Sequence, residues 1–120
     1  MEIHWVGLSE LDDSERTRIE ARLESLVEGH SDLIDLRITG RQTRHHHHGG
    51  KEVRITCQAR GREIVAARTE PDLGLALHEV LDVFEREVHR MREKARDLHR
   101  TRAAEPPDLG NLDRINRDEG

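Results

Sequence analysis

A group of basic residues near the end of the last predicted helix could bind a polyanion. Residues 86–102 contain seven arginines and lysines against three acids, a local charge of +4, although the whole chain of 120 residues carries −5. Cations gathered on one helix can neutralise the phosphates of a nucleic acid. The alternative is a solvated helix with i,i+3 and i,i+4 ion pairs such as Glu87–Arg90 and Asp82–Arg86. Charge alone therefore permits RNA binding without establishing it.

A second candidate site, for a metal ion, is a run of four consecutive histidines: His45, His46, His47 and His48. Successive residues of a strand point to opposite sides, so all four imidazoles could not reach one ion, whereas a flexible loop could present two or three. No spaced Cys or His residues complete a closed structural site. We expect a polar hairpin loop, turned by Gly49 and Gly50, whose affinity for metals is adventitious.

The sequence contains no local motif for nucleophilic catalysis and no glycine-rich phosphate loop. The single cysteine, Cys57, alternates with apolar residues and is predicted to be a small buried side chain. One cysteine cannot form an internal disulfide or a cysteine zinc cluster, which suits a reducing cytoplasm. We therefore expect a non-catalytic cytoplasmic protein with no cofactor and no small-molecule substrate.

Length and composition limit the architecture. A chain of 120 residues forms one domain, and 33% hydrophobic against 38% charged residues predicts a thin core. Trp5 and Phe84 are the only aromatic residues, so stacking of nucleic-acid bases is nearly excluded. No apolar run approaches the length of a membrane span, and the N-terminus lacks the features of a signal peptide, so no membrane partner is expected.

Charge is distributed unevenly along the chain. Residues 1–30 carry eight acids against three bases, whereas residues 31–60 carry six bases against three acids. Residues 105–120 carry five acids against two bases, with two prolines and little apolar content. We expect a folded domain over residues 1–104 and an acidic, disordered tail over residues 105–120.

Hydrophobic periodicity predicts six elements in the order β-α-β-β-β-α. Apolar residues alternate in three segments, at 1–6, 33–41 and 52–60, as they do in half-buried strands, and residues 62–69 after Gly61 form a further strand whose inward side the pattern leaves open. The first helix begins at a capping box formed by Asp12 and Glu15 and stops at Gly29. The second begins at Pro71 and continues for about 30 residues, with its apolar positions three and four apart.

These patterns predict which side chains face the core. The inward set of the middle strands is Ile34, Leu36 and Ile38, then Val53, Ile55, Cys57 and Ala59. The buried stripe of the second helix includes Phe84, Val88, Met91, Ala95 and Leu98. Together they predict an α+β two-layer sandwich, with both helices on one face of a four-stranded sheet. The other face would be open to solvent and would carry Arg37, Thr39, Arg41, Arg54, Thr56, Gln58 and Arg60.

The second helix resembles the C-terminal helix of the ribosome hibernation-promoting factor and ribosome-associated inhibitor family, the sigma-54 modulation proteins. The residues in register with the family pattern are Glu70, Asp72, Leu73, Ala76, Leu77, Asp82, Glu85, Arg86, Val88, Arg90, Arg92, Lys94 and Arg96. The pattern departs at Gly74, Val83 and Glu87, where the family usually has Tyr, Lys and Gln. The resemblance covers about residues 1–100, and in the rest of that range it is one of architecture more than of sequence.

The resemblance implies a short, monomeric form that binds the small ribosomal subunit, through its 16S rRNA, where mRNA and tRNA would lie. Such a protein would hibernate idle ribosomes as part of a stress response. The implied phosphate contacts are Arg86, Arg90, Arg92, Lys94 and Arg96, with His89 at a position that is commonly basic in the family. Strand alternation adds Arg37, Arg54 and Arg60 as weaker candidates. The alternative is a divergent member that binds metal or a protein partner through His45–His48 or the acidic first helix.

Overall fold

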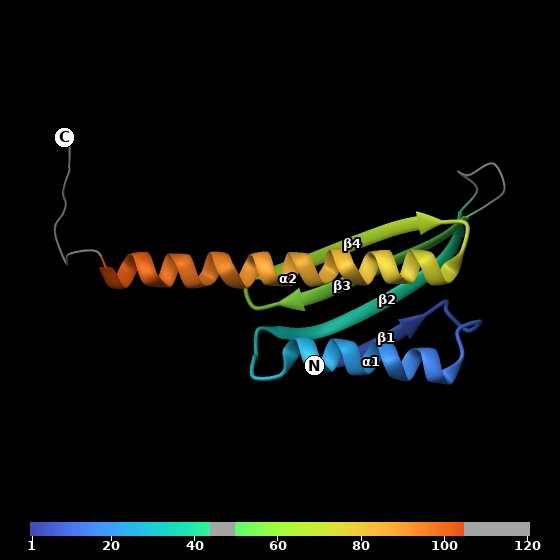
Figure 1. Ribbon diagram of the computed structural model, residues 1–120, viewed down its shortest axis with the longest axis horizontal. Coiled ribbons are helices and arrows are strands. Elements are labelled where there is room, and N and C mark those ends of the chain that lie inside the picture. The colour runs from blue at the N-terminus through green and yellow to red at the C-terminus, as the bar shows by residue number, and fades with distance from the viewer. Residues whose placement is uncertain (44–49, 105–120) are drawn as a thin grey trace. The chain divides into compact units, whose positions relative to one another are not determined.

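The computed structural model describes residues 1–43 and 50–104, with side chains up to residue 98. The elements follow the predicted order: β1 (Glu2–Val6), α1 (Asp13–Val27), β2 (Leu33–Thr43), β3 (Gly50–Ala59), β4 (Arg62–Glu70) and α2 (Leu73–Ala104) (Figure 1). Residues up to Val88 form one compact unit, and a second unit starts at His89.

Two predicted segments lie outside the described residues. One is the acidic tail at 105–120, and the other is the histidine run of the predicted hairpin loop, formed by His45, His46, His47 and His48. The adventitious metal affinity expected of these four histidines therefore stays a prediction, as does the disorder expected of the tail.

The four strands form one sheet in the order β1-β2-β3-β4. Strands β2, β3 and β4 are antiparallel neighbours, whereas β1 pairs with β2 in parallel. The parallel pairing follows from the connection, because α1 crosses between β1 and β2 while the other strands are joined directly. Helix α1 and the Leu73–Val88 part of α2 cover one face of the sheet, so the predicted two-layer sandwich is confirmed (Figure 1).

The core lies between this face and the two helices. In β3 the predicted alternation is confirmed, since Val53, Ile55, Cys57 and Ala59 are all fully buried. From the helices come Ile19, Leu23, Ala76, Leu77, Val80, Leu81, Phe84 and Val88. Phe84 is the largest of the fully buried side chains described. Its burial therefore removes more apolar surface from water than that of any other residue in this thin core.

The prediction that Ile34 faces the core is wrong. Ile34 is 52% exposed, and the preceding Leu33 is buried in its place. The register of β2 against β3 shifts between Leu33 and Asp35. Such an irregularity adds one residue to the strand, so every residue before it changes face relative to simple alternation.

The predicted burial of the α2 stripe is also wrong beyond Val88. Met91 is half-buried, Ala95 is exposed and Leu98 is 61% exposed. Over residues 89–98, the part of the second unit whose side chains are described, no side chain is buried. The apolar spacing of α2 therefore continues beyond Val88, the last buried side chain described in the helix.

Local contacts fix the ends of the helices and hold them together. The Asp12 carboxylate accepts a hydrogen bond from the Glu15 backbone amide at 2.8 Å, which lowers the pKa of the Asp12 carboxyl and confirms Asp12 as the predicted N-cap. Asp72 caps α2 in the same way, by accepting from the Leu75 amide at 2.9 Å. Between the helices, Arg22 of α1 donates to Glu85 and to Asp82 of α2, each at 2.7 Å. Glu85 first, and then Asp82, raise the pKa of the Arg22 guanidinium above its ordinary value.

Candidate nucleic-acid interface

The described end of α2 presents a group of cations on a stretch of helix, residues 89–98, in which no described side chain is buried. We call His89, Arg90, Arg92, Lys94 and Arg96 the α2 basic cluster. All are exposed except Arg92, which is half-buried. With the acids Glu93 and Asp97, residues 89–98 carry four arginines and lysines against two acids, a charge of +2 with histidine neutral. The cluster can therefore offer several cations to one polyanion.

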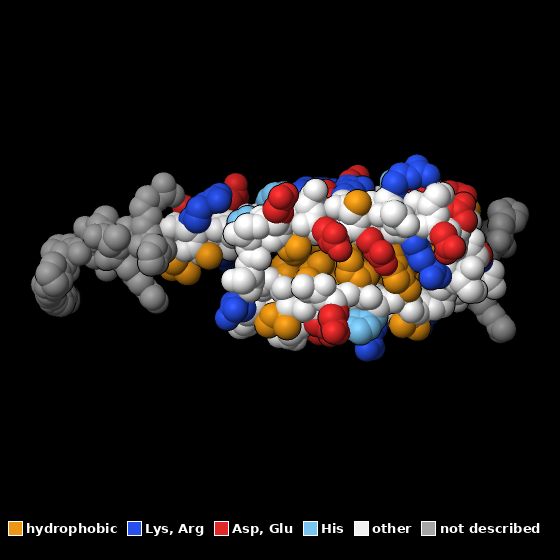
Figure 2. Space-filling view, turned by 90° about the horizontal axis from the view of Figure 1, so that it is seen from below, with side chains coloured by type: hydrophobic (Ala, Val, Ile, Leu, Met, Phe, Trp, Pro, Cys, Tyr) orange, Lys and Arg blue, Asp and Glu red, His pale blue; other side chains and the backbone are white. Residues whose placement is uncertain are grey.

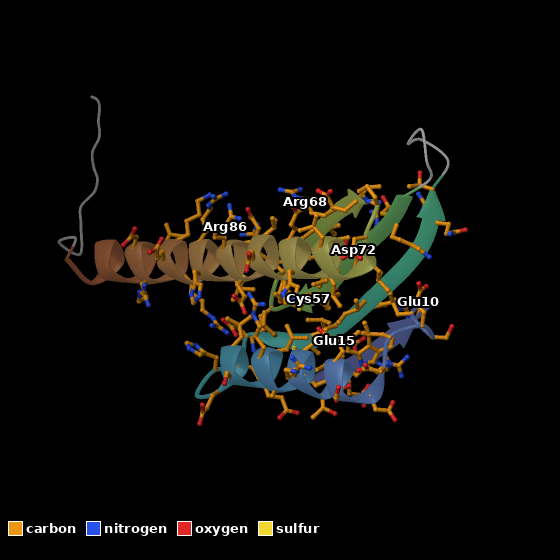
Figure 3. All side chains as sticks on the ribbon, turned by 45° about the vertical axis from the view of Figure 1, so that its right-hand side comes forward. Glu10, Glu15, Cys57, Arg68, Asp72 and Arg86 are labelled. Carbon is orange, nitrogen blue, oxygen red and sulfur yellow. The ribbon has the colours of Figure 1, made fainter. Side chains whose placement is uncertain are left out.

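Helix geometry divides the cluster into two rows. Arg90 and Lys94 are four residues apart, as are Arg92 and Arg96, so the members of each row lie about 6 Å apart along the helix axis. Between the rows, on one side, runs the exposed apolar stripe that ends at Leu98. Figure 2 shows hydrophobic side chains beside basic ones at the described end of α2. Arg86, in the preceding unit, is exposed and extends from α2 away from α1 (Figure 3).

The open face of the sheet carries Arg37 and Arg54 as predicted, but it is not a basic surface. Strand register places three arginines there, Arg37, Arg41 and Arg54, and also four carboxylates, Glu2, Asp35, Glu52 and Glu63. Glu52 pairs with Arg41 at 2.5 Å and with Arg54 at 3.7 Å. Most of the positive charge on this face is therefore balanced within the sheet.

Arg60 lies at the β3–β4 turn and is engaged by another segment. Its Nε donates to the Ser31 carbonyl oxygen at 2.8 Å, and its backbone amide donates to the Asp32 carbonyl oxygen at 2.9 Å. These bonds attach the turn to the loop before β2. The sequence-predicted cations thus fall in separate places: the α2 basic cluster, the balanced sheet face and this turn.

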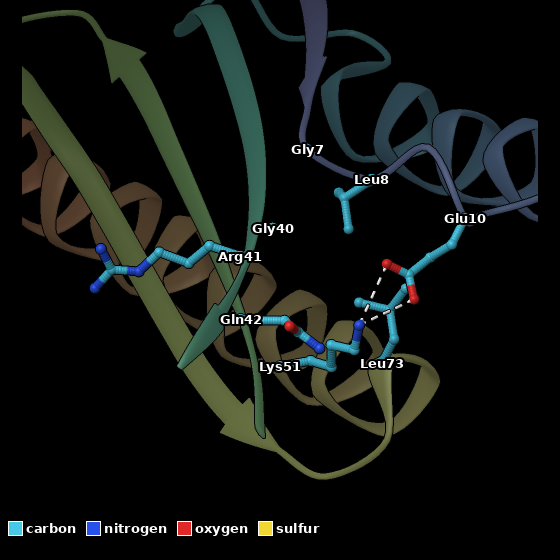
Figure 4. Close-up of a pocket in the computed structure, with 8 residues that line it drawn as sticks. All are labelled: Gly7, Leu8, Glu10, Gly40, Arg41, Gln42, Lys51 and Leu73. Carbon is cyan, nitrogen blue, oxygen red and sulfur yellow. Dashed lines mark hydrogen bonds and ion pairs between the residues drawn. The ribbon is translucent and has the colours of Figure 1, made fainter. Parts of the chain in front are cut away.

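A small pocket lies where β1 ends beside β2 (Figure 4). Gly7 adopts φ +72°, and a Cβ there would lie 2.3 Å from the Gly40 carbonyl oxygen. Only glycine at position 7 therefore lets the end of β1 approach β2 this closely. The cavity holds about 90 Å³, and Lys51 at its rim pairs with Glu10 at 3.2 Å. This volume is far below that of a typical small-molecule site. Sequence reasoning did not find it, because its lining comes from separate segments.

A wider hollow lies between the N-terminal ends of α1 and α2. It is an open depression of about 540 Å³, lined by four carboxylates, those of Glu10, Asp12, Glu15 and Asp72, together with Leu11, Gly74, Leu75 and His78. Its charge has the wrong sign for a nucleic acid. Asp12 and Asp72 already cap the two helices, which accounts for their position.

Cys57 has no features of a catalytic thiol. It is fully buried, and burial raises its pKa to about 11. A thiol with a raised pKa stays protonated near neutral pH and is a poor nucleophile.

None of the helices described is long and apolar enough to cross a membrane.

Comparison with known proteins agrees with this architecture. Residues 1–96 match the model of the family described as sigma 54 modulation protein / S30EA ribosomal protein. Among solved structures, the N-terminal domain of Thermus thermophilus protein Y has 18% identity and a TM-score of 0.59, covering 76% of this chain and 99% of that one. A ribosomal subunit interface protein from Coxiella burnetii has 16% identity and a TM-score of 0.55, covering 81% of this chain and 99% of that one.

At these identities the two structures establish the shared fold alone. No curated protein matches the chain. The family match covers most of the 120 residues, and the family is one of ribosome-binding proteins without catalytic activity. The chain therefore belongs to the sigma 54 modulation protein / S30EA ribosomal protein family.

Proposed function

We propose that this protein binds the small ribosomal subunit through the α2 basic cluster and keeps idle ribosomes from translating. The observation that carries the proposal is the set of four arginines and lysines, three exposed and one half-buried, on a stretch of helix in which no described side chain is buried. Membership of a ribosome-binding family supports RNA as the polyanion. The mechanism is occupation of a site and requires no chemistry.

The aromatic residues favour recognition of phosphates over recognition of bases. Phe84 is fully buried, and Trp5 is half-buried with its Nε1 donating to Glu20 at 2.8 Å. The Arg16 guanidinium lies over the Trp5 ring, 5.4 Å from its centre. Neither ring can serve as a stacking platform without breaking existing contacts. Binding would then depend on charge and on the shape of folded rRNA, and it should weaken steeply as salt increases.

The proposed position is near the path of mRNA and tRNA on 16S rRNA, where a bound monomer would exclude both from the subunit in the cytoplasm. Arg86 would add a contact beside the cluster. Arg37 and Arg54 would contribute less, because Glu52 and the other carboxylates of the open face offset their charge. Arg60 would contribute least, since its guanidinium already donates to Ser31.

The proposal is tested by translation in vitro with two matched charge reversals. One variant carries Arg90→Glu, Lys94→Glu and Arg96→Glu in the cluster, and the other carries Arg37→Glu, Arg41→Glu and Arg54→Glu on the sheet face. Both change the net charge equally. We expect the wild type and the sheet variant to inhibit translation and to compete with mRNA for purified small subunits, whereas the cluster variant should do neither. Equal loss of inhibition in both variants would show that net charge alone causes the effect, whichever surface carries it. Inhibition retained by the cluster variant would refute the proposed surface.

A further inference from the structure

Three side chains that can bind a metal ion converge on the open face of the sheet. Glu2 and His4 are two residues apart in β1, so both point to the same face. Asp35 is the register partner of Glu2 on β2. One ligand atom from each side chain lies within 4.8 Å of the others. We propose that Glu2, His4 and Asp35 form a site for a borderline divalent metal ion such as Zn²⁺.

The two distances from the imidazole of His4 match the spacing of ligands around one ion. His4 Nε2 lies 3.0 Å from Asp35 Oδ1 and 3.4 Å from Glu2 Oε1. Zn²⁺ binds imidazole nitrogen and carboxylate oxygen at about 2.0–2.2 Å, so neighbouring ligand atoms of a six- or four-coordinate ion are roughly 2.8–3.6 Å apart. An ion bound there would stand between the imidazole nitrogen and the two carboxylate oxygens, which that nitrogen now contacts directly.

The donor set indicates the class of ion. One imidazole with two carboxylates suits Zn²⁺, Co²⁺ or Mn²⁺, whereas Mg²⁺ and Ca²⁺ prefer oxygen ligands alone. The His4 and Asp35 side chains are 47% and 51% exposed, which leaves room for water at the remaining coordination positions. The site is therefore of the open type, held by three protein ligands.

Two features of the sheet affect affinity in opposite directions. Pairing of β1 with β2 fixes the backbone of all three ligands, and the Trp5–Glu20 hydrogen bond holds β1 to α1. Arg37 opposes the metal, because it is the register partner of His4 and places a positive charge beside the site. The proposal is independent of ribosome binding, since it uses neither the α2 basic cluster nor any RNA contact.

The test is a titration with Zn²⁺ by calorimetry and with Co²⁺ by visible absorption. The full chain is used with all four histidines of the run at 45–48 replaced by serine, so that they cannot bind the ion. In this background His4→Gln, Glu2→Gln and Asp35→Asn each remove one ligand. Glu63→Gln is the matched control, because it removes a carboxylate from the same row of the sheet, across from Gln58. Circular dichroism checks that each variant is folded.

We expect one ion per chain, at least about a tenfold loss of affinity for each ligand variant, and no change for Glu63→Gln. Arg37→Gln should tighten binding several-fold by removing the neighbouring charge. Binding that is insensitive to His4→Gln, or that falls equally with Glu63→Gln, would mean an adventitious ion only and would overturn the proposal.

Discussion

The two stretches of helix α2, Leu73–Val88 and His89–Leu98, have the same apolar spacing and opposite environments. The first buries Ala76, Leu77, Val80, Leu81, Phe84 and Val88. The second carries Met91, Ala95 and Leu98 at the same spacing, yet none of its described side chains is buried. Periodicity determines which side chains share a face of a helix, but not whether anything covers that face.

Charge changes sign between the same two stretches. Residues 73–88 hold four acids against one arginine, whereas residues 89–98 hold four arginines and lysines against two acids. In the first stretch, Asp82 and Glu85 are used internally, since they accept hydrogen bonds from Arg22 of α1. We infer that the first stretch stabilises the fold and that the second binds the ribosome.

The largest expected effect separates the stretches by stability. Phe84→Ala should lower the free energy of unfolding by about 3–5 kcal/mol, because it leaves a cavity in a core that can collapse only partly. Leu98→Ala should change it by less than about 0.5 kcal/mol, because Leu98 is 61% exposed. Denaturant unfolding of both variants measures the difference. A cost for Leu98→Ala close to that of Phe84→Ala would show that the second stretch is packed.

The core beneath the first stretch should also respond to alkaline pH. Burial raises the pKa of the Cys57 thiol from 9.0 to about 11, so between these values the unfolded chain loses the proton while the folded chain keeps it. The free energy of unfolding should therefore fall as pH rises, in total by on the order of 2 kcal/mol. The pH range from 9 to about 11 is informative because few other side chains titrate there: the chain has no tyrosine and only two lysines.

Denaturant unfolding under reducing conditions at several pH values measures this slope. Cys57→Ala provides the control, since it removes the titrating group. The same alkaline slope in wild type and Cys57→Ala would assign the effect to another group.

A smaller effect should come from the contact between α1 and the first stretch. Arg22→Met removes the bonds to Asp82 and Glu85 while keeping much of the side-chain volume, and should cost about 1 kcal/mol because the pair is partly solvated. Arg96→Met, the same change in the second stretch, should leave stability unaltered. Thermal unfolding of both variants at low and high salt measures this. If Arg96→Met destabilises the protein as much as Arg22→Met, the second stretch of α2 also stabilises the fold, contrary to our inference.

The order of elements could be predicted because each has local determinants. Alternation specified β3 at Val53, Ile55, Cys57 and Ala59, and the capping box at Asp12 specified the start of α1. The exposure of Ile34 could not be predicted, because it depends on a register shift against β3 that local alternation does not encode. The end of burial at Val88 was equally hidden, because the apolar spacing of α2 continues beyond it.

The candidate sites divide in the same way. The α2 basic cluster was predictable, since all its members lie within about two turns of one helix. The near-neutral charge of the open sheet face was not, because Glu52 meets Arg41 and Arg54 only through strand pairing. The Glu2–His4–Asp35 triad was missed for the same reason, because it depends on the parallel register of β1 and β2.

The most direct test of the account is co-sedimentation with purified small ribosomal subunits across a salt series. It compares wild type with the Arg90→Glu, Lys94→Glu, Arg96→Glu variant, whose thermal stability should be unchanged because all three side chains are exposed. Wild type should pellet at low salt and dissociate steeply as salt rises, and the variant should bind weaker by roughly two orders of magnitude. Wild type that stays in the supernatant at low salt, or a variant that pellets with the same salt dependence, would contradict the claim that the second stretch of α2 binds rRNA phosphates.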